Sequence, residues 1–272
     1  LLGTWPLQPS GEAELTPGSE YVERIQNYMA KALHEAKLNT SWIQPNEAWD
    51  AAMREFVAHI LNASPRNKFV PLFLPVAREI ARAGAINSLT QTLLKLTSPG
   101  VPDIYQGSEI WNYSLVDPDN RRLVDYKQRR EMLDSLREAK PEELLQTWPD
   151  GRIKMFLIQV ALQFRRKNVD LFQRGEYLPL RASGTFAEGC VSFARTLQDQ
   201  WLVVIAPRLS SRLDFPPVGQ LWKDTMVDLP PSLVASRVQE IFAGRELAVQ
   251  ANQIRLNDAL SVLPFSAITN IR

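Results

Sequence analysis

The stretch Ser98–Tyr126 has the sequence SPGVPDIYQGSEIWNYSLVDPDNRRLVDY, and it guides the interpretation of the whole chain. Pro99-Gly100 cannot continue the apolar run before it, and Ile104-Tyr105 predict a short strand. A long polar loop follows, after which Asp125 is suited to cap a helix over residues 125–139. A strand, a loop and a helix in this order are typical of one unit of a (β/α)8 barrel, where sites lie at the carboxyl ends of the strands.

Helices are expected on both sides of this stretch, up to about residue 175. Apolar positions recur with helical period after Ser19, a possible cap, and Asn46 is suited to cap a second helix that ends near residue 60. Residues 66–84 contain two prolines, which predict a kinked or split helix ending near Gly84, followed by another helix over 86–96. Asp150 is suited to cap a further helix with apolar positions up to residue 164.

Beyond about residue 180 the pattern changes to short β segments. Residues 191–194 alternate in polarity and 201–205 are an apolar run. Further β segments are expected near residues 221–229, 240–249, 252–256 and 264–271. Proline pairs and a glycine separate these segments, and this spacing predicts an antiparallel β-sandwich.

The composition argues against several classes of protein. The 272 residues include 31 basic and 30 acidic side chains, so no net charge attracts nucleic acid or an anionic membrane. Cys190 is the single cysteine, which excludes an internal disulfide and fits a cytoplasmic protein. No apolar run approaches the roughly 18 residues of a membrane-spanning helix, and neither histidine has metal-ligand spacing. We therefore expect no nucleic-acid partner, no membrane, no metal and no cofactor.

The loop combines charged side chains with aromatic ones, as sugar sites do. Sugar hydroxyls bind charged or amide groups, and the C–H faces of sugars stack on rings. The candidate residues in this loop are Tyr105, Gln106, Glu109, Asp117, Asp119, Asn120, Arg121 and Arg122. A second set, in the turn between two expected helices, consists of Lys37, Ser41 and Trp42. Structural alternatives stay open for both sets, because an Asp–Arg network can simply hold a long loop and a helix–helix turn can be a packed corner.

Two pieces of the central stretch resemble a known family. Pro99-Gly100-Val101-Pro102 and Tyr105-Gln106-Gly107-Ser108-Glu109 are similar to the last barrel strand of the α-amylase family, the family 13 glycoside hydrolases. The longer string over residues 94–122 resembles more specifically the members that form maltooligosyltrehalose, and pieces at 35–46, 87–89 and 222–229 fit the same group. The chain begins without methionine, and the resemblance implies that the catalytic strands precede residue 1. We therefore expect a C-terminal fragment of a longer parent protein.

The residue patterns predict a fold and a domain organisation, and the resemblance agrees with them and adds the barrel. The fold class is α+β, with a helical N-terminal part that includes the last strand-loop-helix unit of a (β/α)8 barrel, followed by a C-terminal antiparallel β-sandwich. Residues 1–95 are expected to be a helical region beside the barrel. Residues 96–180 are expected to contain the final barrel strand, the substrate-side loop and the following helices, and residues 181–272 the β-sandwich domain.

The implied activity is that of an isomerase in trehalose biosynthesis. The parent would convert the reducing-end α-1,4 linkage of a maltooligosaccharide to an α,α-1,1 linkage by intramolecular transglucosylation. All the candidate residues above would then bind substrate. None would be catalytic, so the fragment alone would be inactive and would need the remainder of the parent chain. Two alternatives stay open: another α-glucan hydrolase or glucosyltransferase of the same family, and a non-catalytic glucan-binding or structural module.

Overall fold

The computed structural model describes residues 1–7, 17–233 and 237–271, which form two compact units. Unit 1 consists of Leu1–Ala81 and Asn112–Val124, and unit 2 consists of Arg82–Trp111 and Asp125–Arg272. Helix α3 (Phe69–Thr97) therefore contributes its first part to unit 1 and its second part to unit 2. The expected domain division at residues 95 and 180 stays a prediction.

Unit 1 is built on helices α1 (Ser19–Ala36) and α2 (Glu47–Ile60), which pack against each other and against the start of α3. The Asn46 side chain accepts a hydrogen bond from the Trp49 N–H, which confirms the expected cap of α2. The cap of α1 is Gly18 and not Ser19, so that prediction was wrong by one residue. The core contains Trp5, Tyr21, Ile25, Val57, Leu61, Val70 and Leu74, and Leu115 from the 112–124 segment packs against it.

Helix α3 contradicts the prediction of one helix ending near Gly84 and another over 86–96. It continues through Gly84 to Thr97, with Pro75 inside it. Pro71 lies in the first turn, where a backbone N–H has no intrahelical partner to lose. Beyond Gly84 the helix buries Ile86, Leu89 and Leu93 almost completely. Burial of this apolar face, about 1.5–3 kcal/mol for each large side chain, offsets the cost of about 1 kcal/mol for the glycine and about 3 kcal/mol for the interior proline.

Besides the second part of α3, the α-helices of unit 2 are α4 (Tyr126–Ser135), α5 (Pro141–Gln146), α6 (Arg152–Lys167), α7 (Val169–Gln173) and α8 (Leu256–Ala259). Asp125 caps α4 as expected, because its side chain accepts from the Gln128 N–H. At α6 the N-cap is Gly151, while Asp150 accepts from the Arg152 N–H. The expected strand at Ile104-Tyr105 was wrong, since residues 101–105 have no strand pairing among the described residues. A strand requires a hydrogen-bonded neighbour, which local sequence cannot supply.

The C-terminal part of unit 2 contains two antiparallel sheets. The larger has the order β1-β3-β4-β9-β6-β7 and the smaller β2-β5-β8. The strands are β1 (Glu176–Pro179), β2 (Ala182–Ser183), β3 (Cys190–Leu197), β4 (Gln200–Pro207), β5 (Met226–Asp228), β6 (Arg237–Glu240), β7 (Arg245–Ala248), β8 (Gln253–Arg255) and β9 (Ser266–Thr269). Strands β3 and β4 are longer than the expected segments, β5, β8 and β9 are shorter, and the single segment expected at 240–249 is replaced by β6 and β7. Elements α5, α7, α8, β1 and β2 were not foreseen.

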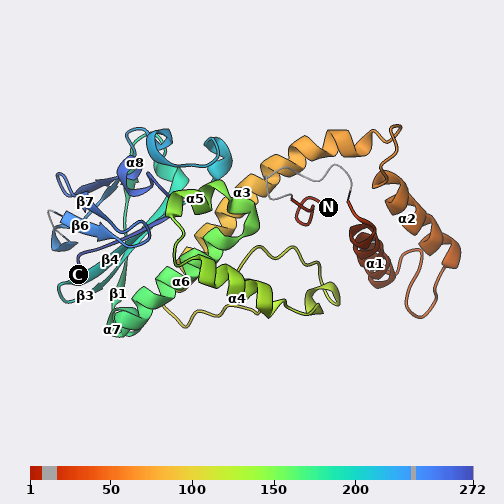
Figure 1. The fold of residues 1–272 in the computed structure, drawn as a ribbon, viewed down its shortest axis with the longest axis horizontal. Coiled ribbons are helices and arrows are strands. Elements are labelled where there is room, and N and C mark those ends of the chain that lie inside the picture. The colour runs from red at the N-terminus through yellow and green to blue at the C-terminus, as the bar shows by residue number, and fades with distance from the viewer. Residues whose placement is uncertain (8–16, 234–236, 272) are drawn as a thin grey trace. The chain divides into compact units, whose positions relative to one another are not determined.

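Strand β4 lies at the centre of the unit 2 core. Its residues from Trp201 to Pro207 are all buried, so both faces of the strand are covered. Val203 and Ile205 share one hydrophobic cluster with Val227 and Ile254 of the smaller sheet. Helix α6 runs beside the larger sheet (Figure 1), and the second part of α3 reaches β4 through the Thr90 hydroxyl, which donates to the Pro207 carbonyl at 2.9 Å. Unit 2 is therefore a mixed helical and antiparallel β structure.

Arg195 on β3 ties helices of unit 2 to the sheet. The side chain is 1% exposed and pairs with no carboxylate among the described residues. Its guanidinium donates instead to five carbonyl oxygens, those of Thr97, Leu171, Phe172, Gly175 and Glu176. Helices α3 and α7 end at this group, so its positive charge also lies at the negative poles of both helices.

Candidate functional site

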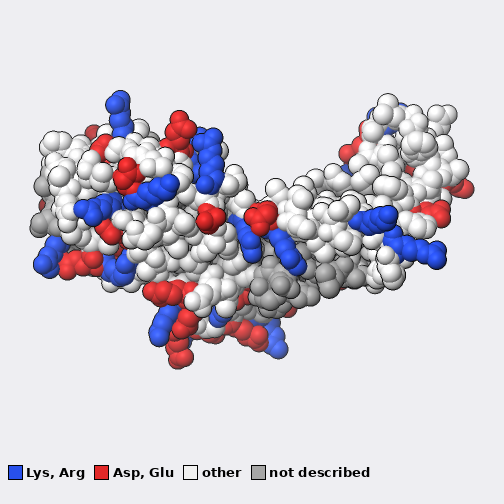
Figure 2. All heavy atoms as spheres, turned by 90° about the horizontal axis from the view of Figure 1, so that it is seen from above, with Lys and Arg blue, Asp and Glu red and all other residues white. Residues whose placement is uncertain are grey.

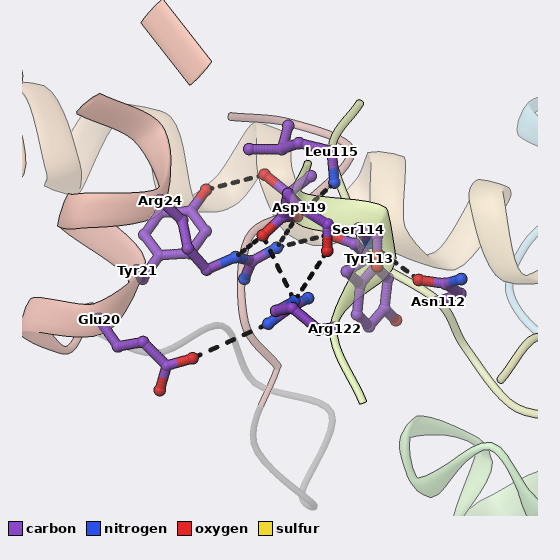
Figure 3. Close-up of polar contacts among 10 residues, drawn as sticks. Glu20, Tyr21, Arg24, Asn112, Tyr113, Ser114, Leu115, Asp119 and Arg122 are labelled. Atoms are coloured by element: carbon purple, nitrogen blue, oxygen red, sulfur yellow. Dashed lines mark hydrogen bonds and ion pairs between the residues drawn. The ribbon is translucent and has the colours of Figure 1, made fainter. Parts of the chain in front are cut away.

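The loop over residues 112–124 is fixed to α1 by an ion pair between Arg24 and Asp119. Arg24 donates from Nε to Asp119 Oδ1 at 2.9 Å and from Nη2 to Asp119 Oδ2 at 3.0 Å. The same Nη2 donates to the Tyr113 carbonyl oxygen at 2.9 Å (Figure 3). This two-bond geometry holds both side chains in one orientation, which a lysine could not do.

Asp119 has further donors that complete its surroundings. The Leu115 N–H donates to its Oδ2 at 2.6 Å, and Arg122 Nε lies 3.4 Å from its Oδ1 (Figure 3). Hydrogen bonding to Arg24 is the largest cause that holds the pKa of Asp119 below its usual range, and the Leu115 N–H acts in the same direction. Asp119 is thus an ionised brace of the loop, with a side chain only 13% exposed.

The other predicted residues of this loop are more open. Asp117 pairs with Arg121, and its carbonyl oxygen accepts from Lys31 Nζ at 2.6 Å. The side chain of Arg121 is 76% exposed and that of Arg122 is 46% exposed. Asn120 is exposed in the short 3-10 helix Asp119–Arg121. The loop therefore exposes the guanidinium groups of Arg121 and Arg122 and the amide of Asn120 to solvent. Asp119 holds the backbone that carries them.

Helix α1 supplies site residues that the sequence reasoning missed. A small hollow of about 130 Å³ lies between α1 and the 116–119 turn. Its lining residues are Arg24, Asn27, Tyr28, Lys31, Val116, Asp117, Pro118 and Asp119. The four helical residues recur at intervals of three and four, which places them on one face of a helix. This spacing can be read from the sequence, but only the structure shows that these four residues line a hollow together with the 116–119 turn.

The second predicted set lies at the turn between α1 and α2. Lys37 ends α1 in a left-handed conformation, and Ser41 closes the turn by accepting from the Gln44 N–H at 2.9 Å. The Trp42 ring meets the His34 ring edge-on at 4.4 Å, and His34 Nε2 lies 2.9 Å from Asp50 Oδ2. Trp42 nevertheless remains 62% exposed. The turn is therefore a packed corner that also leaves a broad indole face open.

Three members of the predicted loop set, Tyr105, Gln106 and Glu109, belong to unit 2 and form a third group, whereas the members from Asp117 to Arg122 belong to unit 1. Glu109 Oε2 accepts from Arg129 Nε at 3.2 Å, and Gln106 Oε1 accepts from the Tyr126 hydroxyl at 3.2 Å. Tyr105 is 57% exposed. Glu109 and Gln106 thus bind the 105–111 segment to α4, and Tyr105 has an exposed ring. The rest of the loop set and the turn set belong to unit 1.

A buried lysine lies beside the third group. Lys154 Nζ is 3.3 Å from the Ile110 carbonyl and 5.9 Å from the centre of the Trp111 ring. Burial is the main cause that lowers the pKa of Lys154 to about 8, and the charge of Lys95 adds to it. Trp111 Nε1 donates to the Trp148 carbonyl at 2.7 Å, so its ring is packed within unit 2.

Four of the five acidic residues of the central stretch are already engaged. Glu109, Asp117 and Asp119 each pair with an arginine, and Asp125 caps α4. No group of three or more His, Cys, Asp or Glu side chains among the described residues is arranged to hold a metal ion. None of the described helices has the length and apolar character needed to cross a membrane. Positive and negative side chains are interspersed over the face in Figure 2, in agreement with the balanced composition.

Comparison with known proteins finds relatives that are much longer than this chain. No family model matches the chain. A Mycobacterium tuberculosis (strain H37Rv) protein named as a maltooligosyl trehalose synthase is 35% identical over 230 residues, which are 85% of this chain and 26% of that protein. The solved maltooligosyltrehalose synthase of Arthrobacter ramosus is 30% identical with a TM-score of 0.75, over 93% of this chain and 30% of that one. A Sulfolobus tokodaii structure titled as a hypothetical maltooligosyl trehalose synthase has 27% identity and a TM-score of 0.68.

The chain is therefore homologous to the maltooligosyltrehalose synthases over most of its own length. The resemblance inferred from the central stretch is confirmed. The chain spans about a quarter of the curated relative and 30% of the Arthrobacter structure, so it corresponds to a part of these enzymes.

Proposed function

We propose that the parent of this chain converts the reducing-end α-1,4 linkage of maltooligosaccharides to an α,α-1,1 linkage, forming maltooligosyltrehalose in the cytoplasm as a member of the α-amylase family. The observation that carries the proposal is the 35% identity over 230 residues to a protein named for this synthesis. The common fold with the Arthrobacter enzyme, at a TM-score of 0.75, supports it.

The proposed reaction proceeds in two balanced displacements at one anomeric carbon. A carboxylate of the parent attacks this carbon, and the terminal glucose leaves with a proton supplied by a general acid. The retained glucose then turns and attacks the same carbon through its anomeric hydroxyl, which gives its proton back to that residue and frees the carboxylate. Water competes in the second step, so the yield depends on keeping the glucose in place.

The role that we assign to this chain is retention of that glucose. The exposed guanidinium groups of Arg121 and Arg122 and the amide of Asn120 are suitable donors for sugar hydroxyls. Arg24 and Asp119 hold the backbone that carries them. Trp42 offers an open indole face, and Tyr105 an open ring, on which a sugar ring can stack. The catalytic carboxylates would come from other parts of the parent, and the isolated chain would be inactive.

The alternatives differ in products and in surface features. A hydrolase of the same family would raise reducing power, whereas the proposed isomerase lowers it. A non-catalytic glucan-binding module would be favoured by an exposed aromatic platform on the β part. Trp201 and Trp222, the two tryptophans that would be suited to this, are 2% and 0% exposed. That feature therefore does not favour the binding-module alternative.

The test is to incubate the full-length parent with maltopentaose and to follow reducing ends and free glucose together. The proposal expects reducing ends to disappear while little glucose is released. Arg122→Ala should raise the share of glucose released, because a retained sugar loses one of its donors. Arg137→Ala is the matched control, since that arginine pairs with Asp134 on the exposed face of α4. Rising reducing power in the unmodified parent would overturn the proposed reaction. An unchanged share of released glucose in Arg122→Ala would show that the loop does not retain the glucose.

A further inference from the structure

One face of helix α3 is apolar and exposed to solvent. Leu72, Val76 and Ile80 are large apolar side chains on this face, and all three are exposed. They are spaced by four residues, so they form one inclined row along the helix. We call these three residues the α3 stripe. Leu74, on the other side of the same helix, is buried in the core of unit 1, so exposure is confined to one side of this part of α3.

The next position in this row is Gly84, which has no local explanation. It is exposed within α3, and a Cβ atom at this position would meet no atom of another described segment within 4 Å. Its backbone is helical, so the conformation does not require glycine. Glycine destabilises a helix interior relative to alanine, and its presence is explained where another element must come close to the backbone. Gly84 therefore indicates close approach of an element outside the described residues.

The spacing of the row indicates that this element is a helix. Rows at intervals of four pack into the grooves between such rows on a second helix, which is the most frequent arrangement of two packed helices. The axes of packed helices lie about 8–10 Å apart, and small side chains at the contact allow the shorter distances. A partner helix would therefore cross α3 nearest to Gly84, with its own apolar side chains against the α3 stripe.

The occupant that fits best is a helix from the rest of the parent. The matched part of this chain corresponds to 26% of the curated relative, so most of that protein has no counterpart here. A second copy of the chain fits less well, because a stable interface between separate proteins uses about 20–30 residues on each side. Three side chains and a glycine are far fewer. A segment of the same polypeptide needs less contact area, because the covalent connection keeps it at a high effective concentration.

We propose that the α3 stripe and Gly84 bind an apolar helix from the part of the parent that lies outside this chain. The surface is then buried in the parent and exposed only in the isolated chain. The proposal concerns the assembly of the parent, so it holds whatever reaction the parent catalyses.

Thiol labelling of the full-length parent tests whether the stripe is covered. Ile80→Cys is treated with iodoacetamide, and mass spectrometry of the peptide that contains position 80 gives the rate, so other cysteines do not interfere. Labelling should be at least about tenfold slower than for Arg137→Cys, which replaces a side chain that is 79% exposed, because a covered thiol reacts only when the contact opens. A smaller difference would overturn the proposal. Leu72→Cys serves if Ile80→Cys does not fold.

Photo-crosslinking identifies what covers the stripe. The parent is produced with p-benzoylphenylalanine in place of Val76, or in place of Leu72 if the first variant does not fold. Illumination should join this residue to a peptide of the same molecule from outside the 272 residues, with apolar residues at intervals of three and four. Cross-links to a second copy, to residues of this chain, to a peptide without that period, or to no peptide would each count against the proposed helix.

Gly84→Leu tests the close approach by the sign of its effect. If a helix crosses at this position, leucine should lower the Tm of the parent by about 2 °C or more, because the added side chain enters a packed contact. If the space is open, as it is in this chain, leucine should leave Tm unchanged or raise it, because leucine favours a helix more than glycine does. That second result would overturn the crossing at Gly84, and Gly84→Ala serves if the leucine variant does not fold. None of these measurements uses product analysis, so failure here is distinct from failure of the proposed reaction.

Discussion

The two units differ in how completely each buries its apolar surface. In unit 2, five successive residues of β4, from Leu202 to Ala206, have no exposed surface at all. In unit 1, the first part of α3 exposes Leu72, Val76 and Ile80 at 76%, 53% and 45%. These three residues, spaced by four, form one stripe along the helix. The β4 strand of unit 2 is thus covered on both faces by other residues of unit 2, whereas unit 1 leaves one apolar face of α3 exposed. The chain corresponds to about a quarter of its curated relative.

The largest expected effect concerns the buried arginine of unit 2. Arg195→Met keeps the length of the side chain but removes the donors of five carbonyl oxygens. We expect a loss of about 3 kcal/mol or more in the free energy of unfolding, because buried acceptors are left without partners. Urea unfolding of the 272-residue chain, followed by near-UV circular dichroism, measures it.

The matched control for this prediction is Arg174→Met. Arg174 lies on the surface at the end of α7, and its replacement should change the free energy of unfolding by less than about 0.5 kcal/mol. If Arg195→Met lowered the free energy of unfolding no more than Arg174→Met, the hydrogen bonds from Arg195 to the five carbonyl oxygens would not be what joins the helices to the sheet.

Features set by neighbouring residues were predictable from the sequence. The caps at Asn46 and Asp125 were correct because a side chain and a backbone N–H three residues later decide them. An Asp–Arg network in the loop was one of the two alternatives left open, and the pair that forms between Asp117 and Arg121 is close in sequence. The resemblance to the family also came from one contiguous string.

Features set by distant contacts were not predictable. The strand expected at Ile104-Tyr105 does not form, because pairing needs a second strand. Arg24 and Asp119 are 95 positions apart, so no local pattern shows that α1 holds the loop. The five carbonyls around Arg195 come from two separate segments of the chain, Thr97 and residues 171–176, and only tertiary structure brings them together.

A medium effect is expected where the unit 1 loop depends on one ion pair. Asp119→Asn removes the charge that Arg24 binds through two hydrogen bonds, and hydrogen bonds to charged groups contribute about 1.5–3 kcal/mol. The expected result is faster amide exchange over residues 112–124, most of all at Leu115, whose N–H donates to Asp119. Arg121→Ala is the control, because its exposed pair with Asp117 should contribute less than about 1 kcal/mol.

The same ion pair predicts a pH dependence. The pKa of Asp119 is lowered in the folded chain, mainly by the Arg24 hydrogen bonds, so the stabilisation is complete above the usual carboxyl pKa. It is lost as the pH falls from that value through the lower folded pKa. Proteolysis of the loop, with an acid-active protease at each pH, should increase over this acidic range. Asp119→Asn should be cleaved readily at every pH, and a wild-type loop with no acid response would contradict the assignment of Asp119 as an ionised brace.

The smallest effect on stability, and the sharpest contrast between the units, is expected at the exposed stripe of α3. Leu72→Ser should change the free energy of unfolding by less than about 0.5 kcal/mol, because the side chain is already exposed to water. Leu74→Ser, two positions along the same helix, removes a side chain that is 6% exposed, and should cost about 2 kcal/mol or more. Because an uncovered apolar stripe favours association, Leu72→Ser should also reduce self-association of the isolated chain in sedimentation velocity. If Leu72→Ser instead destabilised the chain as much as Leu74→Ser, the stripe would be part of a core that unit 1 completes by itself, and the difference drawn between the two units would disappear.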